Sequence, residues 1–530
     1  MTRRQRGLAR AAFSLAAGNL ANRGLGMAYR VLLSRFLGAQ GLGILQLAMA
    51  GYGAVVAPFI AGLPPGIGRV AARLDDPGSP KARRLLIILS LGAALLAAGT
   101  AAATVAVVPR LGSDAWRTVR EHIPFVLFIP IMVLAVVSSI FRGLFVGLRR
   151  VGPMVASHAA EQGARCAVLA AALALLLHRH WPLALRLQLV TANLLLGEMV
   201  SLLVLLRRYR GLLAGMWVLP RQADEAPGVT AGDTGMGTVV QVAVPVALQR
   251  SVGSLARLVE ATAIPALLAS SGLTSAQALA FYGELGGMTT PLIYLPTVFI
   301  FAMTAVLLPA MADTRVPPAV TQHRGRLALI WAGHGGAVTS VALYLGGDFA
   351  VRLLFGNLAA GETGYPYAGR LAILLAGVPF FFYIDAVATT ILRGLGRAAA
   401  PLAADLASGG VRLGSLFLLM GGTGGSVLGV PAAVTAGAAV ACAMDLVFAR
   451  RALDLPWRDL TPLLHAGAAV IPAAAAGRWL LGGLWAQGAD PSMSLWDLLL
   501  PQAAALTAAL AVYGAVTALL AQGTRQLRPR

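Results

Sequence analysis

Six arginines lie inside long apolar stretches of this 530-residue chain. A guanidinium at the centre of a bilayer costs about 2.5 to 3.5 kcal/mol on an insertion scale, so such a residue normally faces a water-filled cavity or a partner. The planar guanidinium can hold two phosphate oxygens at once, which suits it to a phosphate or diphosphate group. The six residues therefore indicate a path for an anionic cargo: Arg23, Arg30, Arg165, Arg250, Arg257 and Arg412.

Four of these arginines form two matching pairs. Arg23 and Arg30 have the same separation as Arg250 and Arg257, and that separation places both members of a pair on one face of a helix. If the two helices face each other across two lobes, four guanidiniums converge on one cavity, which we predict to be the substrate-binding site. The alternative is that some of them neutralise buried acids or extend to the membrane interface.

Other charged residues in the apolar stretches have both structural and functional interpretations. Glu161 and Arg165 are spaced to pair on one helix, and with Arg412 they are either cavity residues or structural ones. Asp385 and Asp405 are the leading candidates for a site that binds a coupling cation, because an acid within the membrane either binds a cation or proton or offsets an arginine. No catalytic residue, metal site or cofactor is predicted, apart from a possible coupling cation or the membrane potential as the source of energy.

The apolar stretches themselves predict an all-α polytopic membrane protein. The chain is 58% apolar and only 12% charged, so the bilayer must be its main solvent. A span needs roughly 20 apolar residues. By that measure we predict about fourteen transmembrane helices, at 11–33, 42–67, 85–108, 122–147, 153–177, 187–206, 238–268, 279–311, 326–347, 370–392, 399–420, 427–448, 462–482 and 497–521.

The net charge of +21 is compatible with nucleic-acid binding, but its distribution argues against it. With a cytoplasmic N-terminus, most of the 42 basic residues fall in the predicted cytoplasmic loops. This asymmetry is the positive-inside rule, and it places both termini in the cytoplasm. We therefore attribute the basic excess to topology and to anionic membrane lipids, and expect no nucleic-acid partner.

Two halves of the chain resemble each other. Arg23-Gly-Leu-Gly26 with Arg30 matches Arg250-Ser-Val-Gly253 with Arg257, and Ile140-Phe-Arg-Gly-Leu144 matches Ile391-Leu-Arg-Gly-Leu395. We interpret these matches as two parallel six-helix lobes around a central cavity. The predicted parts are an N-terminal lobe, a cytoplasmic linker, a C-terminal lobe, and two further helices with a basic tail, at 1–206, 207–237, 238–450 and 451–530.

Prolines predict breaks in two of the helices, because proline removes a backbone donor. Gly62-Leu-Pro-Pro-Gly66 is expected to end the second helix, and Pro291, Pro296 and Pro309 to interrupt the eighth. The spacing of Gly62 and Gly66 also favours close packing against another helix.

Several short motifs span most of the chain: Tyr29-Arg30 with Arg35-Phe-Leu-Gly38; Ala61-Gly-Leu-Pro64; Phe141-Arg-Gly-Leu-Phe145 with Gly147; Glu161-Gln162 with Arg165; Tyr282-Gly283 with Gly287-Met288 and Pro291-Leu292; and Thr390-Ile-Leu-Arg-Gly-Leu-Gly396. In their residues and their order, these motifs resemble the stage V sporulation protein B branch of the multidrug/oligosaccharidyl-lipid/polysaccharide (MOP) exporter superfamily.

The resemblance implies two lobes forming a V around a cavity that is lined by arginines. It also implies a flippase for lipid-linked oligosaccharide or peptidoglycan precursors, in cell-wall or spore-cortex synthesis in the bacterial cytoplasmic membrane. The implied partners are a polyprenyl diphosphate-linked saccharide, membrane lipids and wall-synthesis enzymes. The branch often has lysine at the position of Arg23, and Glu284 is a departure, because a neutral residue is expected there.

The main alternative function is a multidrug or organic-cation antiporter of the same fold, whose cavity should be acidic and aromatic. The arginines oppose it. A membrane-embedded glycosyltransferase would need a sizeable acidic loop, whereas Asp224, Glu225 and Asp233 have no metal-ligand spacing. A P-loop is absent because Lys81, the only lysine, follows Pro80. We therefore predict a transporter and not an enzyme.

Overall fold

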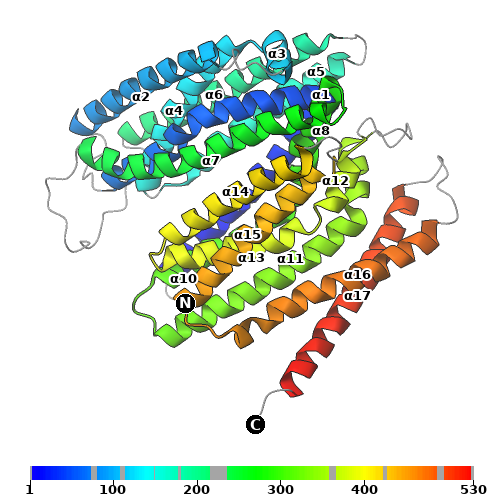
Figure 1. The fold of residues 1–530 in the computed structure, drawn as a ribbon. Coiled ribbons are helices and arrows are strands. Elements are labelled where there is room, and N and C mark those ends of the chain that lie inside the picture. The colour runs from blue at the N-terminus through cyan, green and yellow to red at the C-terminus, as the bar shows by residue number, and fades with distance from the viewer. Residues whose placement is uncertain are drawn as a thin grey trace. The chain divides into compact units, whose positions relative to one another are not determined.

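The computed structural model describes helices only. The described residues are 3–72, 80–107, 114–148, 150–176, 181–214, 236–356, 366–421, 427–485 and 495–526, and none of these forms a β-strand. The long helices are α1 (Arg3–Ala71), α2 (Pro80–Val107), α4 (Phe128–Gly147), α5 (Gly152–Leu176), α6 (Leu183–Leu213), α7 (Met236–Ser270), α10 (Val298–Ala312), α11 (Pro318–Phe355), α13 (Val378–Gly394), α14 (Ala399–Met420), α15 (Gly429–Ala452), α16 (Thr461–Trp485) and α17 (Leu495–Gln526) (Figure 1).

This architecture confirms the predicted fold class, a polytopic all-α membrane protein. Within the described ranges, eleven helices are long and apolar enough to cross a membrane, or twelve if one sharply bent pair is a single span. Each of the predicted ranges overlaps a helix. The number fourteen nevertheless stays a prediction, because Ala21–Ala71 of α1 is counted as one span although it turns at Gly38, and α5 is not among the eleven.

The first two predicted helices are joined without a loop. The chain is helical on both sides of Gly38, whose φ of 71° and ψ of −179° turn α1 within one residue. Glycine adopts a positive φ with little steric cost, and this makes such a turn possible without a longer connection. The prediction of a loop over 34–41 is therefore wrong, because one glycine replaces it.

The second half of α1 also continues further than predicted. Pro64 and Pro65 do not end the helix, which runs on to Ala71. Neighbouring helices pack tightly here: a side chain at Gly143 of α4 would overlap the backbone of Pro64. Gly62 and Gly66 lie in equally close contact with Ala243 and Val239 of α7. Such packing allows proline within a membrane helix, where neighbours compensate for the lost hydrogen bonds.

The eighth predicted helix is broken, as the prolines indicate. It comprises α8 (Ser275–Glu284), a π-helical turn η3 (Leu285–Thr289), α9 (Thr290–Tyr294), a 3-10 turn η4 (Leu295–Thr297) and α10. Pro291 and Pro296 lie at the starts of α9 and η4, where a missing backbone N–H is tolerated. Pro309 lies inside α10 without ending it, so the expectation that it interrupts the helix is wrong. The tenth predicted helix is likewise divided, into α12 (Ala368–Leu374) and α13, with a bend of 57°.

The chain packs as two compact units. Unit 1 contains residues 1–266 and 274–283, and unit 2 contains 267–273 and 284–530. Helix α7 therefore packs with the N-terminal helices. The predicted lobes and their boundaries stay a prediction, since 215–235 of the proposed linker lies outside the described residues. Its first residues, 207–213, continue α6.

Two smaller features complete the units. In unit 1, the short helix α3 (Asp114–His122), which the sequence did not suggest, buries Trp116, and the indole donates a hydrogen bond to Thr262 of α7 at 3.2 Å. In unit 2, α16 and α17 form a hairpin against α11 (Figure 1). Small residues of all three helices form its core, and His334 of α11 is hydrogen-bonded to the Tyr513 hydroxyl at 2.7 Å.

Candidate functional site

The four predicted cavity arginines are exposed on two helices of unit 1. Arg23 and Arg30 lie on α1, within the candidate span Ala21–Ala71, and Arg250 and Arg257 lie on α7, within Val239–Ser270. Each pair belongs to one uninterrupted stretch of helix, so its two members share a face. Among the described residues, the guanidiniums of Arg30 and Arg250 have no hydrogen-bond or ion-pair partner. A guanidinium placed so within an apolar span needs water, a lipid head group or a ligand.

All four arginines lie in unit 1, because the described parts of α1 and α7 that carry them belong to it. That these two helices belong to opposite lobes, as the sequence repeat suggests, stays a prediction. The glycine contacts between α1 and α7 are the physical reason that both lie in unit 1, because they bring the two backbones together without intervening side chains. Whether the four guanidiniums converge on one cavity remains a prediction.

A second group of charges is buried between α4, α5 and α6. Arg165 contacts Glu161 at 2.9 Å and Glu198 at 3.3 Å, and Arg142 contacts Glu161 at 3.2 Å. The side chains of these four residues are between 7% and 13% exposed. With two acids and two arginines the group is neutral overall, which reduces the cost of burying its charges.

Hydrogen bonds to neighbouring helices hold this buried ionic network, which we define as Arg142, Glu161, Arg165 and Glu198. Arg142 donates to the Ser201 hydroxyl of α6 at 2.8 Å. The Asn193 amide donates to the backbone carbonyl of Arg165 at 3.0 Å. A side chain at Gly197 would overlap the Arg165 guanidinium, so this glycine leaves the space that Arg165 occupies.

The sequence anticipated only part of the network. The spacing of Glu161 and Arg165 suggests their contact, but this spacing does not indicate that Arg142 joins them. Arg142 turns inward because Glu161 and Ser201 offer it acceptors. Glu198 was considered only as one of several acids in the spans. One signal in the sequence could have indicated all four residues of the buried ionic network. Acids and arginines occur together on consecutive predicted helices, and burying such charges in a membrane is costly unless they form ion pairs.

Unit 2 carries the predicted cation-site residues. The carboxyl groups of Asp385 on α13 and Asp445 on α15 lie close enough to influence each other electrostatically. Thr389 donates to Asp445 at 2.6 Å. Asp405, on α14, is exposed and lies near both. The inner neighbour of Asp385 is thus Asp445, which the sequence had not singled out, while Asp405 is the outer member of the group.

Two further observations limit the choice of ligand. Within the described residues, no three His, Cys, Asp or Glu side chains are arranged to hold a metal ion. Arg412 of α14 packs against Gly437 of α15, where a side chain would contact its Cβ and Cδ. Arg412 is therefore only partly exposed and belongs to the packing of unit 2.

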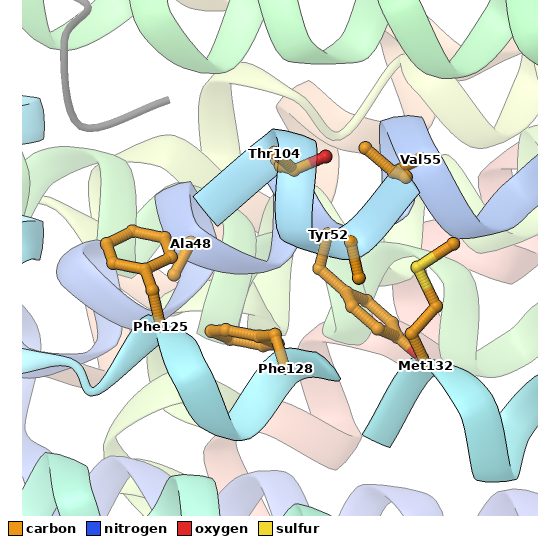
Figure 2. Close-up of a pocket in the computed structure, with 9 residues that line it drawn as sticks. Ala48, Tyr52, Val55, Thr104, Phe125, Phe128 and Met132 are labelled. Carbon is orange, nitrogen blue, oxygen red and sulfur yellow. The ribbon is translucent and has the colours of Figure 1, made fainter. Parts of the chain in front are cut away.

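Figure 2 shows a small apolar pocket in unit 1, between α1, α2 and the start of α4. Aromatic rings of Tyr52, Phe125 and Phe128 surround it, with Met132 at one side. The Thr104 hydroxyl donates to its own helix at Thr100, so it offers no donor to a ligand. None of the predicted site residues lines this pocket, which is too apolar to bind an anion.

Long apolar helices with charged residues at these positions, in two compact units, define a polytopic membrane protein. The polysaccharide biosynthesis protein family matches residues 8–315, more than half of the chain. The chain belongs to this family.

Known proteins agree with this assignment. The chain is 22% identical to stage V sporulation protein B of Bacillus subtilis (strain 168) over 430 residues, which are 80% of each chain. Its fold is similar to the lipid II flippase MurJ in an inward closed conformation, with a TM-score of 0.61 and 12% identity over 96% of this chain and 99% of that one. It is also similar to an inward-facing MATE multidrug transporter of the MOP superfamily, with a TM-score of 0.63 and 14% identity, covering 81% and 94%.

Proposed function

We propose that this transporter flips a polyprenyl diphosphate-linked saccharide across the bacterial cytoplasmic membrane, for cell-wall or spore-cortex synthesis. The observation that carries the proposal is the pair of exposed guanidiniums at Arg30 and Arg250 within apolar spans, for which the described part of the chain offers no hydrogen-bond or ion-pair partner. Together with Arg23 and Arg257 they provide positive charge for a diphosphate. The relatives named for sporulation and for lipid II flipping support the same class of cargo.

In the proposed mechanism the diphosphate-sugar head enters from the cytoplasmic side while the prenyl tail stays in lipid. The arginines replace part of the hydration that the charged head loses, which is the main energetic obstacle to its passage. Alternating access then exposes the head on the outer side, and no covalent bond is made or broken. Both termini are proposed to lie in the cytoplasm, following the basic residues.

The experiment that tests this function uses purified protein in liposomes that contain a labelled polyprenyl diphosphate saccharide. We expect the label to become accessible on the opposite leaflet much faster than in protein-free liposomes. Equal rates with and without protein would reject the proposal. A parallel measurement of organic-cation efflux distinguishes the antiporter alternative, since movement of a lipophilic cation without movement of the saccharide would favour it.

We further propose that Asp385 and Asp445 bind the coupling cation as a shared proton, with Asp405 as the outer acid. Two carboxyl groups this close together do not readily ionise at the same time, so they favour holding one proton between them. Thr389 orients Asp445 from the same helix that carries Asp385. The sequence analysis proposed Asp385 and Asp405 for the cation site, and this assignment adds the buried Asp445.

Asp445→Asn should therefore remove the dependence of translocation on a pH gradient and slow transport at least about tenfold. The amide keeps the shape of the side chain but cannot release a proton. The measurement is the translocation rate in liposomes with and without an imposed pH gradient. Asp313→Asn, at an exposed acid after α10, serves as the control and should keep the wild-type response. A pH response that survives in Asp445→Asn and in Asp385→Asn would exclude this site.

A further inference from the structure

Glu284 is wholly buried at the end of α8, where family resemblance leads one to expect a neutral residue. One carboxylate oxygen, Oε2, accepts hydrogen bonds from the backbone N–H groups of Tyr367 at 2.7 Å and Ala368 at 2.6 Å. These are donors at the start of α12, which have no acceptor within that helix. Glu284 thus acts as the cap of a helix more than 80 residues away in the sequence.

Thr289 contacts the same residue from the other side. Its hydroxyl donates to the carbonyl of Ala368 at 3.2 Å, and the side chain is fully buried. Ala368 is therefore held through both its N–H and its C=O by side chains of the broken span. Three hydrogen bonds in all connect Glu284 and Thr289 to the first residues of α12.

The π-helical turn η3 explains how two residues five positions apart can contact one target. In an α-helix such residues lie about 140° apart around the axis, so they would face different neighbours. In a π-helical turn the hydrogen bond runs from residue i to i+5, and the two side chains come onto nearly the same face. The Thr290 hydroxyl, which donates to the Leu285 carbonyl at 2.7 Å, bonds across this same wider turn.

The hydrogen bonds from Glu284 and Thr289 to the start of α12 position the bend between α12 and α13. The two helices meet at 57°, and α13 carries Asp385 and Thr389. The ring of Tyr294, at the end of α9, packs edge-on against Phe382 of α13 with centroids 4.9 Å apart. The broken span thus contacts both sides of the bend, through Glu284 and Thr289 before it and through Tyr294 after it.

We infer that Glu284 is a positioning residue that, with Thr289, clamps the start of α12 to the π-helical turn so that α9 and α12–α13 move as one piece. The clamp itself does not depend on the identity of the cargo. Its consequence for transport, the placement of Asp385, rests on the proposed function. The two claims are separated by measuring them in different experiments.

Hydrogen–deuterium exchange of the full-length protein in detergent or nanodiscs tests the clamp directly. In Glu284→Ala we expect the amides of Tyr367 and Ala368 to exchange about tenfold faster or more than in wild type, because two charge-assisted hydrogen bonds are lost. Glu284→Gln keeps an acceptor oxygen and should restore most of the protection. Exchange in the α16–α17 hairpin should not change, which distinguishes a local clamp from general loosening.

Thr289→Val provides an independent test if Glu284→Ala does not fold. Valine keeps the shape of threonine but has no hydroxyl, so exchange at the start of α12 should again increase. Thr304→Val is the matched control, since the Thr304 hydroxyl donates only to Phe301 of its own helix, α10. Unchanged protection of α12 in Thr289→Val, together with unchanged protection in Glu284→Ala where it folds, would overturn the inference.

Discussion

Replacing Arg30 with alanine should reduce translocation of a polyprenyl diphosphate saccharide by about 10- to 100-fold. A hydrogen bond to a charged group contributes about 1.5–3 kcal/mol, and each 1.4 kcal/mol corresponds to a factor of ten. Arg250→Ala should act in the same direction, because both guanidiniums are exposed within apolar spans. The measurement is the initial translocation rate in liposomes at equal protein content.

Two further variants make this result specific. Arg30→Lys keeps the charge but cannot bind two phosphate oxygens at once, so its rate should lie between those of wild type and Arg30→Ala. Arg84→Ala removes an exposed arginine near the start of α2, before the candidate span Leu86–Thr104, and should leave the rate unchanged. If Arg30→Ala and Arg84→Ala transport equally well, the proposed site is wrong.

Replacing Arg165 with methionine should destabilise unit 1 by about 3–5 kcal/mol, because Glu161 and Glu198 lose their shared partner while buried. The expected observation is a large fall in the midpoint of thermal unfolding in detergent. The Glu161→Leu/Arg165→Met double variant should recover part of the lost stability. In this variant the Glu161 carboxylate is removed together with its partner Arg165, so it is no longer buried without that partner.

The chain offers a closely matched control for this measurement. Arg352 and Asp348 of α11 form an ion pair at 3.0 Å with the same i,i+4 spacing, but their side chains are 53% and 41% exposed. An exposed pair of this kind contributes about 0–1 kcal/mol, so Arg352→Met should hardly change the unfolding midpoint. Equal effects of Arg165→Met and Arg352→Met would show that burial of the network contributes little.

The existence and type of the helices could be predicted because long apolar runs have few alternatives in a bilayer. The connections between the helices were harder to predict from the sequence. One residue, Gly38, turns α1, and no composition rule separates such a glycine from the many that only allow close packing. The short helix α3 was missed for a different reason: its apolar face is only Ala115, Trp116 and Val119, too brief for a periodic signal.

The candidate site shows the same limit. Pairs within one helix, such as Glu161 and Arg165, follow from spacing, but partners on different helices depend on how those helices rotate and slide against each other. Arg142 and Asp445 were therefore overlooked as partners, although their residue types were known. Glu284 was recognised only as an anomaly, because its partners are backbone amides, which leave no trace in the residue types of a sequence.

The close backbone contacts at Gly62 and Gly66 have a mechanical consequence. They couple the second half of α1 to α7, and these two helices, which carry the four predicted cavity arginines, belong to the same compact unit. A rigid rotation of that unit would displace all four guanidiniums as a set. During such a rotation the electric field of the membrane would act on four positive charges at once. The acids on α13, α14 and α15 belong to unit 2 and not to the unit that rotates.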